Sequence, residues 1–208
     1  METEKRILTF VADISNISDD EYEKIYRNVP KFRQKKADVL RNRDARIQSV
    51  AVWYLYMMAK KKYQIGKDHN FNLSHSGKYV LCSIGPKDEK IGCDVEMLGV
   101  CRENVAKRFF CESESARICG TEEEKIEMFY RIWVLKESFM KATRKGMALG
   151  MNEFEIVFTK EGRPKIQRYP DWVKEEFFYK EYELRDGKVA VCSTLDAFSI
   201  RPEFLKFS

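Results

Sequence analysis

Strand-like runs occur at the two ends and in the middle of the sequence, and helix-like segments fill the intervals between them. Residues 5–13 form the first run, and residues 78–84 and 90–97 form two more on either side of a GPKDE turn. The spacing of this middle pair is typical of a β-hairpin. Because each half of the chain supplies helices and a small sheet, the order predicts an α+β fold of two similar α/β lobes, pseudo-twofold in arrangement, with the functional site at their interface.

Helix and turn signals divide these intervals further. Ser18 and Glu21 have the spacing of a capping box, which predicts a helix over residues 19–27. A basic helical stretch begins near residue 31 and continues into an apolar helix that ends near residue 62. A helical region at 102–145 precedes four expected strands, which lie at residues 154–159, 163–167, 176–184 and 188–195.

The two lobes are expected to meet near residue 100, although no flexible linker marks the boundary. This divides the chain into an N-terminal lobe of residues 1–100 and a C-terminal lobe of residues 101–208. With 44% hydrophobic residues among 208, the chain can bury a sizeable core, and its 10 Gly and 5 Pro are too few for a disordered protein. We therefore expect a folded globular protein.

Targeting signals and cysteine usage bear on the cellular compartment. The charged N-terminus with its short apolar run differs from a signal peptide. The most apolar helical segment, residues 49–59, is shorter than the roughly 20 residues that a membrane span needs. The six cysteines show no C-x-x-C spacing, so reduced thiols are expected rather than disulfides or zinc. These features predict a cytoplasmic protein without a membrane partner.

Two carboxylates lie one residue apart in the run IGCDVE, residues 91–96. On a strand, Asp94 and Glu96 point to the same face, roughly 7 Å apart. Their repulsion raises the proton affinity of each unless a positive group joins them. A solvent-facing strand edge would explain the alternation of acidic and apolar residues. A site for Mg²⁺ would explain the pair of acids, because this ion takes one or two carboxylates and leaves positions for phosphate oxygens.

Two further segments carry groups suited to a phosphate ligand. Residues 74–77, Ser-His-Ser-Gly, are expected to form a polar turn that either holds a phosphate oxygen or is an ordinary loop. In residues 130–147 an apolar stripe at helical spacing leaves Lys136 and Glu137 outside the buried face. Glu137 either forms a surface ion pair with Lys141 or serves as a third metal ligand or general base.

The net charge of +5 is unevenly placed, with basic residues concentrated in residues 31–46 and at 60–62. Such a charge run is usually a solvated helix face. Alternatively, it binds a phosphate-bearing ligand or an acidic partner. Taken alone, the charge run of this region favours the solvated helix face.

Taken in order, these segments resemble the motifs of the 4′-phosphopantetheinyl transferase superfamily, in particular its Sfp-type branch. FNLSHS is similar to the F-N-x-S-H-S motif, IGCDVE to G-[IV]-D-[IV]-E, and WVLKESFMKATRKGM to W-x-x-K-E-[SA]-x-x-K. KRFFCESE, residues 107–114, is similar to the family's R-F-F-x-x-x-E segment. The family's G-K-P turn is reduced here to Gly66 and Lys67, with Asp68 in place of the proline.

The resemblance implies an enzyme that transfers the phosphopantetheine arm of coenzyme A to a serine of an apo acyl or peptidyl carrier protein and releases adenosine 3′,5′-bisphosphate. It also implies a monomer, a magnesium cofactor, an acidic carrier protein as partner, and coenzyme A in the cleft between the halves. The implied metal ligands are Asp94, Glu96 and Glu137, and the implied catalytic residues are Glu137, Lys141 and His75. The implied coenzyme A contacts are Lys31, Lys35, Arg46, Ser74, His75, Lys136 and Lys141.

Two other functions would use some of the same features. A Mg²⁺-dependent hydrolase of nucleotide pyrophosphates would employ the same acids with water as the nucleophile. A basic nucleic-acid-binding module would use residues 31–62, but no recognisable nucleic-acid motif accompanies this region. We therefore expect no nucleic-acid partner.

Overall fold

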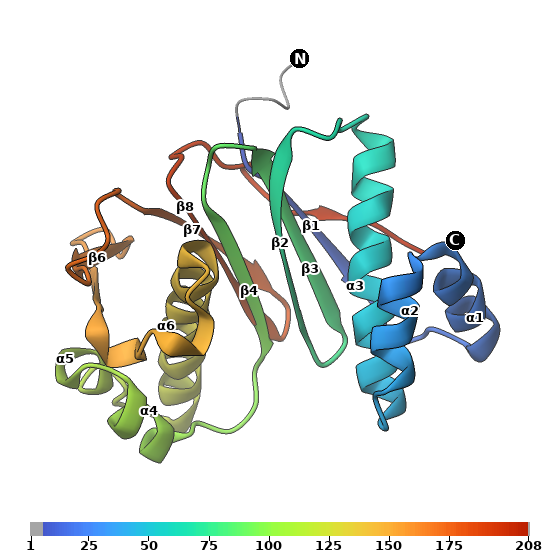
Figure 1. Cartoon of the computed structure of the whole chain (residues 1–208). Coiled ribbons are helices and arrows are strands. Elements are labelled where there is room, and N and C mark those ends of the chain that lie inside the picture. The colour runs from blue at the N-terminus through green and yellow to red at the C-terminus, as the bar shows by residue number, and fades with distance from the viewer. Residues whose placement is uncertain (1–5, 208) are drawn as a thin grey trace.

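Two separate sheets stand side by side between two long helices in the computed structural model, which describes residues 6–207 (Figure 1). The first sheet has the strand order β2 (His69–Ser76), β3 (Tyr79–Pro86), β1 (Leu8–Asp13) and β9 (Glu203–Phe204). The second has the order β4 (Ile91–Met97), β8 (Gly187–Ser193) and β7 (Phe178–Leu184), and β5 (Glu155–Phe158) pairs with β6 (Pro164–Arg168). The structure therefore has the α+β class that the order of elements predicts.

The helices cover the outer flanks of the two sheets. The N-terminal set comprises α1 (Asp19–Asn28), α2 (Lys31–Asp38) and α3 (Arg43–Lys62), and α3 packs on the first sheet. The C-terminal set comprises α4 (Glu103–Phe109), α5 (Glu112–Ser115) and α6 (Glu122–Thr143), followed by the short 3₁₀ turns η2 (Gly146–Ala148) and η3 (Met151–Glu153). Figure 1 shows α3 and α6 on opposite flanks, with both sheets between them.

Local capping signals explain where the N-terminal helices begin. The capping box of Ser18 and Glu21 is present at the start of α1, as predicted. The helical stretch expected from residue 31 to 62 is two helices, because the Asn42 side chain accepts hydrogen bonds from the amides of Asp44 and Ala45 and caps a new helix there. The break separates the exposed basic helix α2 from α3, which is buried along much of its length.

The predicted hairpin of residues 78–84 and 90–97 is wrong. Strand β3 pairs with β1 on one side and with β2 on the other, so both of its edges are already occupied. Strand β4 instead pairs with β8 in the second sheet, with Asp94 opposite Ala190. The turn at residues 86–90 thus carries the chain from one sheet to the other, and it leaves β4 as an edge strand beside β2.

The predicted polar turn at residues 74–77 is also wrong. Residues 69–76 form strand β2, and the chain turns only at Gly77, with φ of +51°, and Lys78. The strand forms because Phe71 and Leu73 pack on the core under α3, while the residues between them point away. Ser74 and Ser76 therefore project from an ordered strand.

The expected division of the chain at residue 100 stays a prediction. Strand β4 precedes that residue, yet its ladder is with β8, which belongs to the C-terminal half. Strand β9, near the C-terminus, lies parallel to β1 in the first sheet. Each half of the chain thus contributes one strand to a sheet that is otherwise formed by the other half.

Helix α6 lies unusually close to β4 at a single glycine. A Cβ atom on Gly92 would lie 2.0 Å from the Ser138 carbonyl oxygen and 2.3 Å from the Ala142 amide nitrogen. Only a residue without a side chain allows this contact. It brings the Glu137 and Lys141 turn of α6 beside the acidic residues of β4.

Two further observations concern the cysteines and the membrane. All six cysteines are free, in agreement with the reduced thiols expected from their spacing. Within residues 6–207, no helix combines the length and the apolar character that crossing a bilayer would require.

Candidate active site between the two sheets

Strands β2 and β4 are edge strands of different sheets, and side chains of β2 join them. The Asn72 side-chain oxygen accepts a hydrogen bond from the Cys93 amide at 3.0 Å. Ser74 donates to Asp94 Oδ1 at 2.8 Å, and Ser76 donates to Glu96 Oε2 at 2.5 Å. Because alternate residues of a strand share a face, Asn72, Ser74 and Ser76 form one row that orients both acids of β4.

A cavity of about 310 Å³ lies where β2, β4 and α6 meet. Strand β2 contributes residues from its second half, β4 contributes its two acids, and α6 contributes three residues spaced four apart, so that they share one helix face. The lining residues are Leu73, Ser74, His75, Asp94, Glu96, Trp133, Glu137 and Lys141. All the predicted metal ligands and catalytic residues are therefore brought together around one cavity.

Asp94 and Lys141 form the centre of the site. The Lys141 ammonium lies 2.6 Å from Asp94 Oδ1 and also donates to Ser74 Oγ at 3.0 Å. Asp94 is only 3% exposed. Its second oxygen, Oδ2, is buried without a hydrogen-bond partner. Since buried carboxylate oxygens nearly always have partners, this oxygen is a specific place for a ligand of positive charge.

The ionised forms of the other two carboxylates, Glu96 and Glu137, are disfavoured in the folded protein. Burial raises the pKa of Glu96, and the charge of Asp94 raises it further. Burial and the charge of Asp94 likewise raise the pKa of Glu137. For Lys141, burial lowers the pKa, but the charge and hydrogen bond of Asp94 together with the effects of Cys93 and Glu137 outweigh burial, and the net pKa is raised. One lysine thus balances only part of the negative charge that three acids bring to this cavity.

His75 stands at the mouth of the cavity. Although its side chain is exposed to solvent, the protein packed around the ring lowers its pKa, and the charges of Lys141 and Lys36 lower it further. These two lysines come from opposite sides of the cleft, since Lys36 lies on α2 and Lys141 on α6. The entrance is therefore electropositive, whereas the floor is acidic.

The donor set fits a hard divalent cation. All three acidic groups offer oxygen ligands, and the unpartnered Asp94 Oδ2 lies among them. Within the described residues, no three histidine, cysteine or acidic side chains are already arranged as a ready-made metal site. The site therefore has the ligand chemistry that Mg²⁺ prefers, but its carboxylates would have to move to bind the ion together.

The structure does not bring Lys136 to the cavity, which corrects the role expected for it. Lys136 is fully buried, and its ammonium contacts Glu114 Oε1 at 2.7 Å and the carbonyl oxygens of Met151 and Phe154. An ammonium has three N–H donors, and these three acceptors use all of them. Lys136 has no donor left for a phosphate.

The three predicted contacts in the basic region lie outside the cavity. Lys31 and Lys35 are on α2, and Arg46 is in the first turn of α3; all three are exposed. Figure 1 shows α2 and α3 on the side of β2 away from α6. These residues therefore do not line the cavity, and their contact with a nucleotide stays a prediction.

Sequence reasoning missed three residues that shape the site. Asn72 and Ser76 join β2 to β4. In a strand, their alternation with Ser74 places all three side chains on one face, and this alternation is the sequence signal that could have found them. Trp133 lines the cavity one turn before Glu137, and its ring lies 5.7 Å from that of Phe129. The spacing of Trp133, Glu137 and Lys141 at four-residue intervals would have placed all three on one face.

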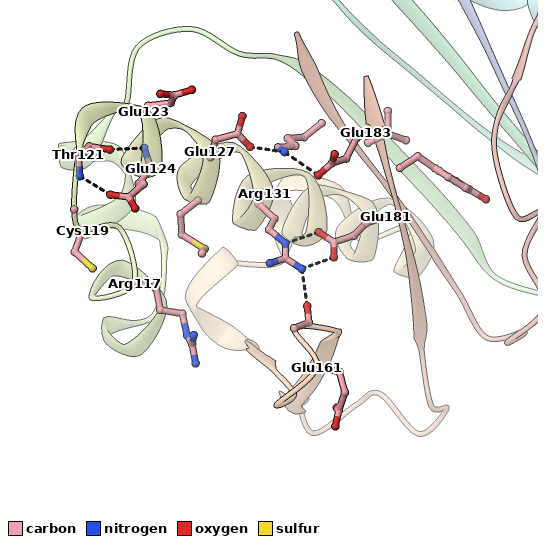
Figure 2. A pocket seen from close by; sticks show the side chains of 16 residues that line it. Arg117, Cys119, Thr121, Glu123, Glu124, Glu127, Arg131, Glu161, Glu181 and Glu183 are labelled. Atoms are coloured by element: carbon pink, nitrogen blue, oxygen red, sulfur yellow. Dashed lines mark hydrogen bonds and ion pairs between the residues drawn. The ribbon is translucent and has the colours of Figure 1, made fainter. Parts of the chain in front are cut away.

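A larger cavity of about 1060 Å³ lies against another part of α6 and the strands β7 and β8. Figure 2 shows its acidic lining and Arg131, whose guanidinium donates to both carboxylate oxygens of Glu181. Lys188 similarly pairs with Glu127 and Glu183. The lining of this larger cavity includes none of the predicted site residues. We therefore assign the candidate active site to the smaller cavity.

A model of the 4′-phosphopantetheinyl transferase superfamily matches residues 90–192. This range begins just before β4 and ends in β8, so it contains Asp94, Glu96 and Glu137. The chain belongs to the 4′-phosphopantetheinyl transferase superfamily.

Individual relatives support the Sfp-type branch of this superfamily. The chain is 35% identical over 128 residues to the 4′-phosphopantetheinyl transferase Sfp of Bacillus subtilis (strain 168), covering 61% of this chain and 55% of that protein. It is 30% identical over 141 residues to 4′-phosphopantetheinyl transferase gsp of Aneurinibacillus migulanus, covering 65% of this chain and 57% of the relative. The chain thus spans a little over half the length of these relatives.

One solved structure illustrates the extent of the structural likeness. The holo-[acyl-carrier-protein] synthase of Thermotoga maritima superposes with a TM-score of 0.44 at 23% identity, covering 50% of this chain and 61% of that chain.

Proposed function

We propose that this protein transfers the 4′-phosphopantetheine arm of coenzyme A to a serine of an apo acyl or peptidyl carrier protein and releases adenosine 3′,5′-bisphosphate. The observation that carries the proposal is the cavity between β2, β4 and α6, where three carboxylates, Lys141 and His75 meet. Membership of the superfamily supports the same reaction.

Asp94, Glu96 and Glu137 would hold Mg²⁺. The unpartnered Asp94 Oδ2 supplies one ligand without breaking an existing contact, and a cation would relieve the raised pKa values of Glu96 and Glu137. A bound Mg²⁺ supplies Lewis-acid stabilisation to the pyrophosphate of coenzyme A. Ser74 and Ser76 keep Asp94 and Glu96 oriented toward the cavity through their hydroxyl groups.

Coenzyme A would bind with its pyrophosphate at the cavity and its nucleotide end along the basic residues of α2 and α3. Ser74, His75 and Lys141 are proposed to contact the phosphates, and Lys31, Lys35 and Arg46 to hold the 3′-phosphate and adenine. A cavity of about 310 Å³ is at the lower limit for a ligand pocket, so it suits the pyrophosphate rather than the whole molecule. The rest of coenzyme A would lie in the open cleft.

Catalysis of this reaction depends mainly on positioning the reacting groups and on stabilising the negative charge of the phosphates. The carrier serine attacks the phosphorus next to the pantetheine, and the bond to the bisphosphate breaks. Glu137 accepts the serine proton, a task suited to a carboxylate that lines the cavity where the serine attacks. Lys141 stabilises the negative charge on the departing bisphosphate, provided that ligand binding draws its ammonium from Asp94.

The proposed partner is an acidic carrier protein that meets this chain as a monomer in the cytoplasm. Lys36 on α2 acts electrostatically on His75 at the cavity entrance, and Lys31 and Lys35 on the same helix are also exposed, so we expect this basic face to meet the partner. Opposite charges on the two proteins would raise the association rate, and added salt would reduce it.

The decisive experiment is incubation with coenzyme A, Mg²⁺ and a panel of apo carrier proteins, followed by intact-mass spectrometry. We expect a carrier to gain the mass of the arm in the wild type and to remain unmodified with Asp94→Ala or Glu137→Ala, while circular dichroism shows that both variants fold. Release of adenosine 3′,5′-bisphosphate without any carrier would instead identify a pyrophosphate hydrolase. If no carrier is modified with any divalent metal, the proposal is wrong.

A further inference from the structure

Lys136 and Glu114 form a fully buried ion pair that the proposed reaction does not use. Both side chains are 0% exposed, and Lys136 Nζ lies 2.7 Å from Glu114 Oε1. The ammonium also donates to the carbonyl oxygens of Met151 at 2.8 Å and Phe154 at 2.9 Å. It lies 4.2 Å from the centre of the Phe154 ring. Every donor of the ammonium is therefore directed into the core of the C-terminal half.

Glu114 extends this contact to the surrounding elements. Its Oε1 accepts a hydrogen bond from the Ile156 amide at 2.7 Å, and its Oε2 accepts one from the Cys111 amide at 2.8 Å. The carboxylate thus joins the start of α5 to strand β5, and Lys136 ties α6 to both. A buried charged network of this kind has only one arrangement in which every donor and acceptor has a hydrogen-bond partner.

The position of the pair along α6 connects it to the candidate site. Lys136 and Glu137 are neighbours on the helix, so their side chains leave the axis about 100° apart. With Lys136 held toward Glu114, Glu137 points to the cavity. Rotation of the helix would disturb the packing of the fully buried Ile132, Leu135 and Phe139, and it would also separate two buried charges at high cost.

We propose that the Glu114–Lys136 pair is a positioning element that sets the rotation of α6 and so presents Glu137 to the metal; this inference rests on the proposed function. Glu114 and Lys136 touch neither the cavity nor the reacting groups. They act through the helix backbone, and their loss should weaken Mg²⁺ binding more than it weakens binding of coenzyme A.

The test removes the two charges together, because one buried charge without its partner would unfold the region. Lys136→Met/Glu114→Gln retains the aliphatic chain and an oxygen acceptor. The matched control is Lys125→Met/Glu103→Gln. It removes the ion pair between Lys125 of α6 and Glu103 of α4, whose charged atoms lie 2.8 Å apart but near the surface. Both variants are compared with the wild type by thermal unfolding, by calorimetric titration with Mg²⁺, and by coenzyme A binding in EDTA.

We expect Lys136→Met/Glu114→Gln to unfold cooperatively, to bind Mg²⁺ about tenfold or more weakly, and to bind coenzyme A in EDTA with nearly unchanged affinity. The control should change neither affinity. If the double variant does not fold, Glu114→Asp, which keeps both charges but shortens the carboxylate side chain by one methylene group, should show the same selective loss to a smaller degree. Unchanged Mg²⁺ affinity in a folded variant would overturn the inference. A wild type that binds no Mg²⁺ would instead overturn the metal-dependent function on which it rests.

Discussion

Gly92 of β4 lies directly beneath Ala142 of α6, so closely that a Cβ atom would come within 2.3 Å of the Ala142 amide nitrogen. Since the obstructing atoms are backbone atoms, Gly92→Ala must displace the helix. We expect the free energy of unfolding to fall by about 1–3 kcal/mol and transfer activity to be lost, because Glu137 and Lys141 would move away from Asp94.

Chemical denaturation and the carrier-modification assay check this prediction. Gly66→Ala is the matched control for stability, since a Cβ atom there meets nothing within 4 Å. If Gly92→Ala were as stable and as active as the wild type, the close contact of α6 with β4 would not be important for the site.

Removal of Lys141 should make the protein depend on Mg²⁺ for stability. In Lys141→Met, the nearly buried Asp94 loses the ammonium that lies 2.6 Å away, and without metal we expect a loss of up to about 3 kcal/mol. Bound Mg²⁺ would replace the missing positive charge, so the metal should raise Tm more in this variant than in the wild type.

Differential scanning calorimetry with Mg²⁺ and with EDTA measures both effects. Lys87→Met serves as the control, because the pair of Lys87 with Asp68 is exposed and its loss should change the stability by less than about 1 kcal/mol. An equal metal-induced rise of Tm in Lys141→Met and the wild type would contradict the prediction.

The acidity of the site should make both stability and metal binding depend on pH. The folded-state pKa values of Glu96 and Glu137 are raised above their ordinary value of 4.5, first by burial and then by Asp94. Each group therefore favours the fold below pH 4.5 and loses that contribution as the pH rises through its raised pKa. In EDTA, Glu96→Gln/Glu137→Gln should lose less stability than the wild type as the pH rises from 4.5 toward 7.

Protons and Mg²⁺ compete for the same carboxylates, so the Mg²⁺ affinity of the wild type should fall as the pH is lowered. Because of the raised pKa values, the decline should begin above pH 4.5. Calorimetric titration at several pH values measures it. A constant affinity down to pH 4.5 would show that these carboxylates do not bind the ion.

Ser76 should matter for the metal although it does not line the cavity. Its hydroxyl donates to Glu96 Oε2 at 2.5 Å, and Ser76→Ala leaves this carboxylate free to rotate. We expect Mg²⁺ affinity to fall about tenfold with little change in stability. The control is Ser113→Ala, which removes a serine hydrogen bond to Glu155 outside the site. Equal metal affinity in Ser76→Ala and the control would show that Glu96 is held by other contacts.

Much of the site was predictable because its chemistry is encoded in short segments. The period of two in IGCDVE put Asp94 and Glu96 on one face, and helical spacing separated Glu137 from the buried stripe of α6. Likewise, the capping box of Ser18 and Glu21 marked the start of α1, as the structure confirms. Local periodicity determines which way a side chain points relative to its own element.

The errors arose where a choice depended on distant parts of the chain. The GPKDE turn is compatible with a hairpin, but β1 and β2 occupy both edges of β3, and β8 takes β4 into the other sheet. Similarly, the small polar residues of Ser-His-Ser-Gly predict a turn, whereas the strand character of β2 depends on the packing of Phe71 and Leu73 under α3. Strand pairing is decided by long-range contacts, which local patterns do not contain.

Lys136 and Lys141 show the same division within a single helix. The sequence by itself determined that both are lysines of an amphipathic helix near Glu137, and it marked both as candidates for phosphate. Only the tertiary structure decided that Lys141 meets Asp94 at the cavity, while Lys136 is buried against Glu114, 22 positions earlier in the chain. The reason is that a charge takes its role from the groups that surround it, and folding brings these together from different elements.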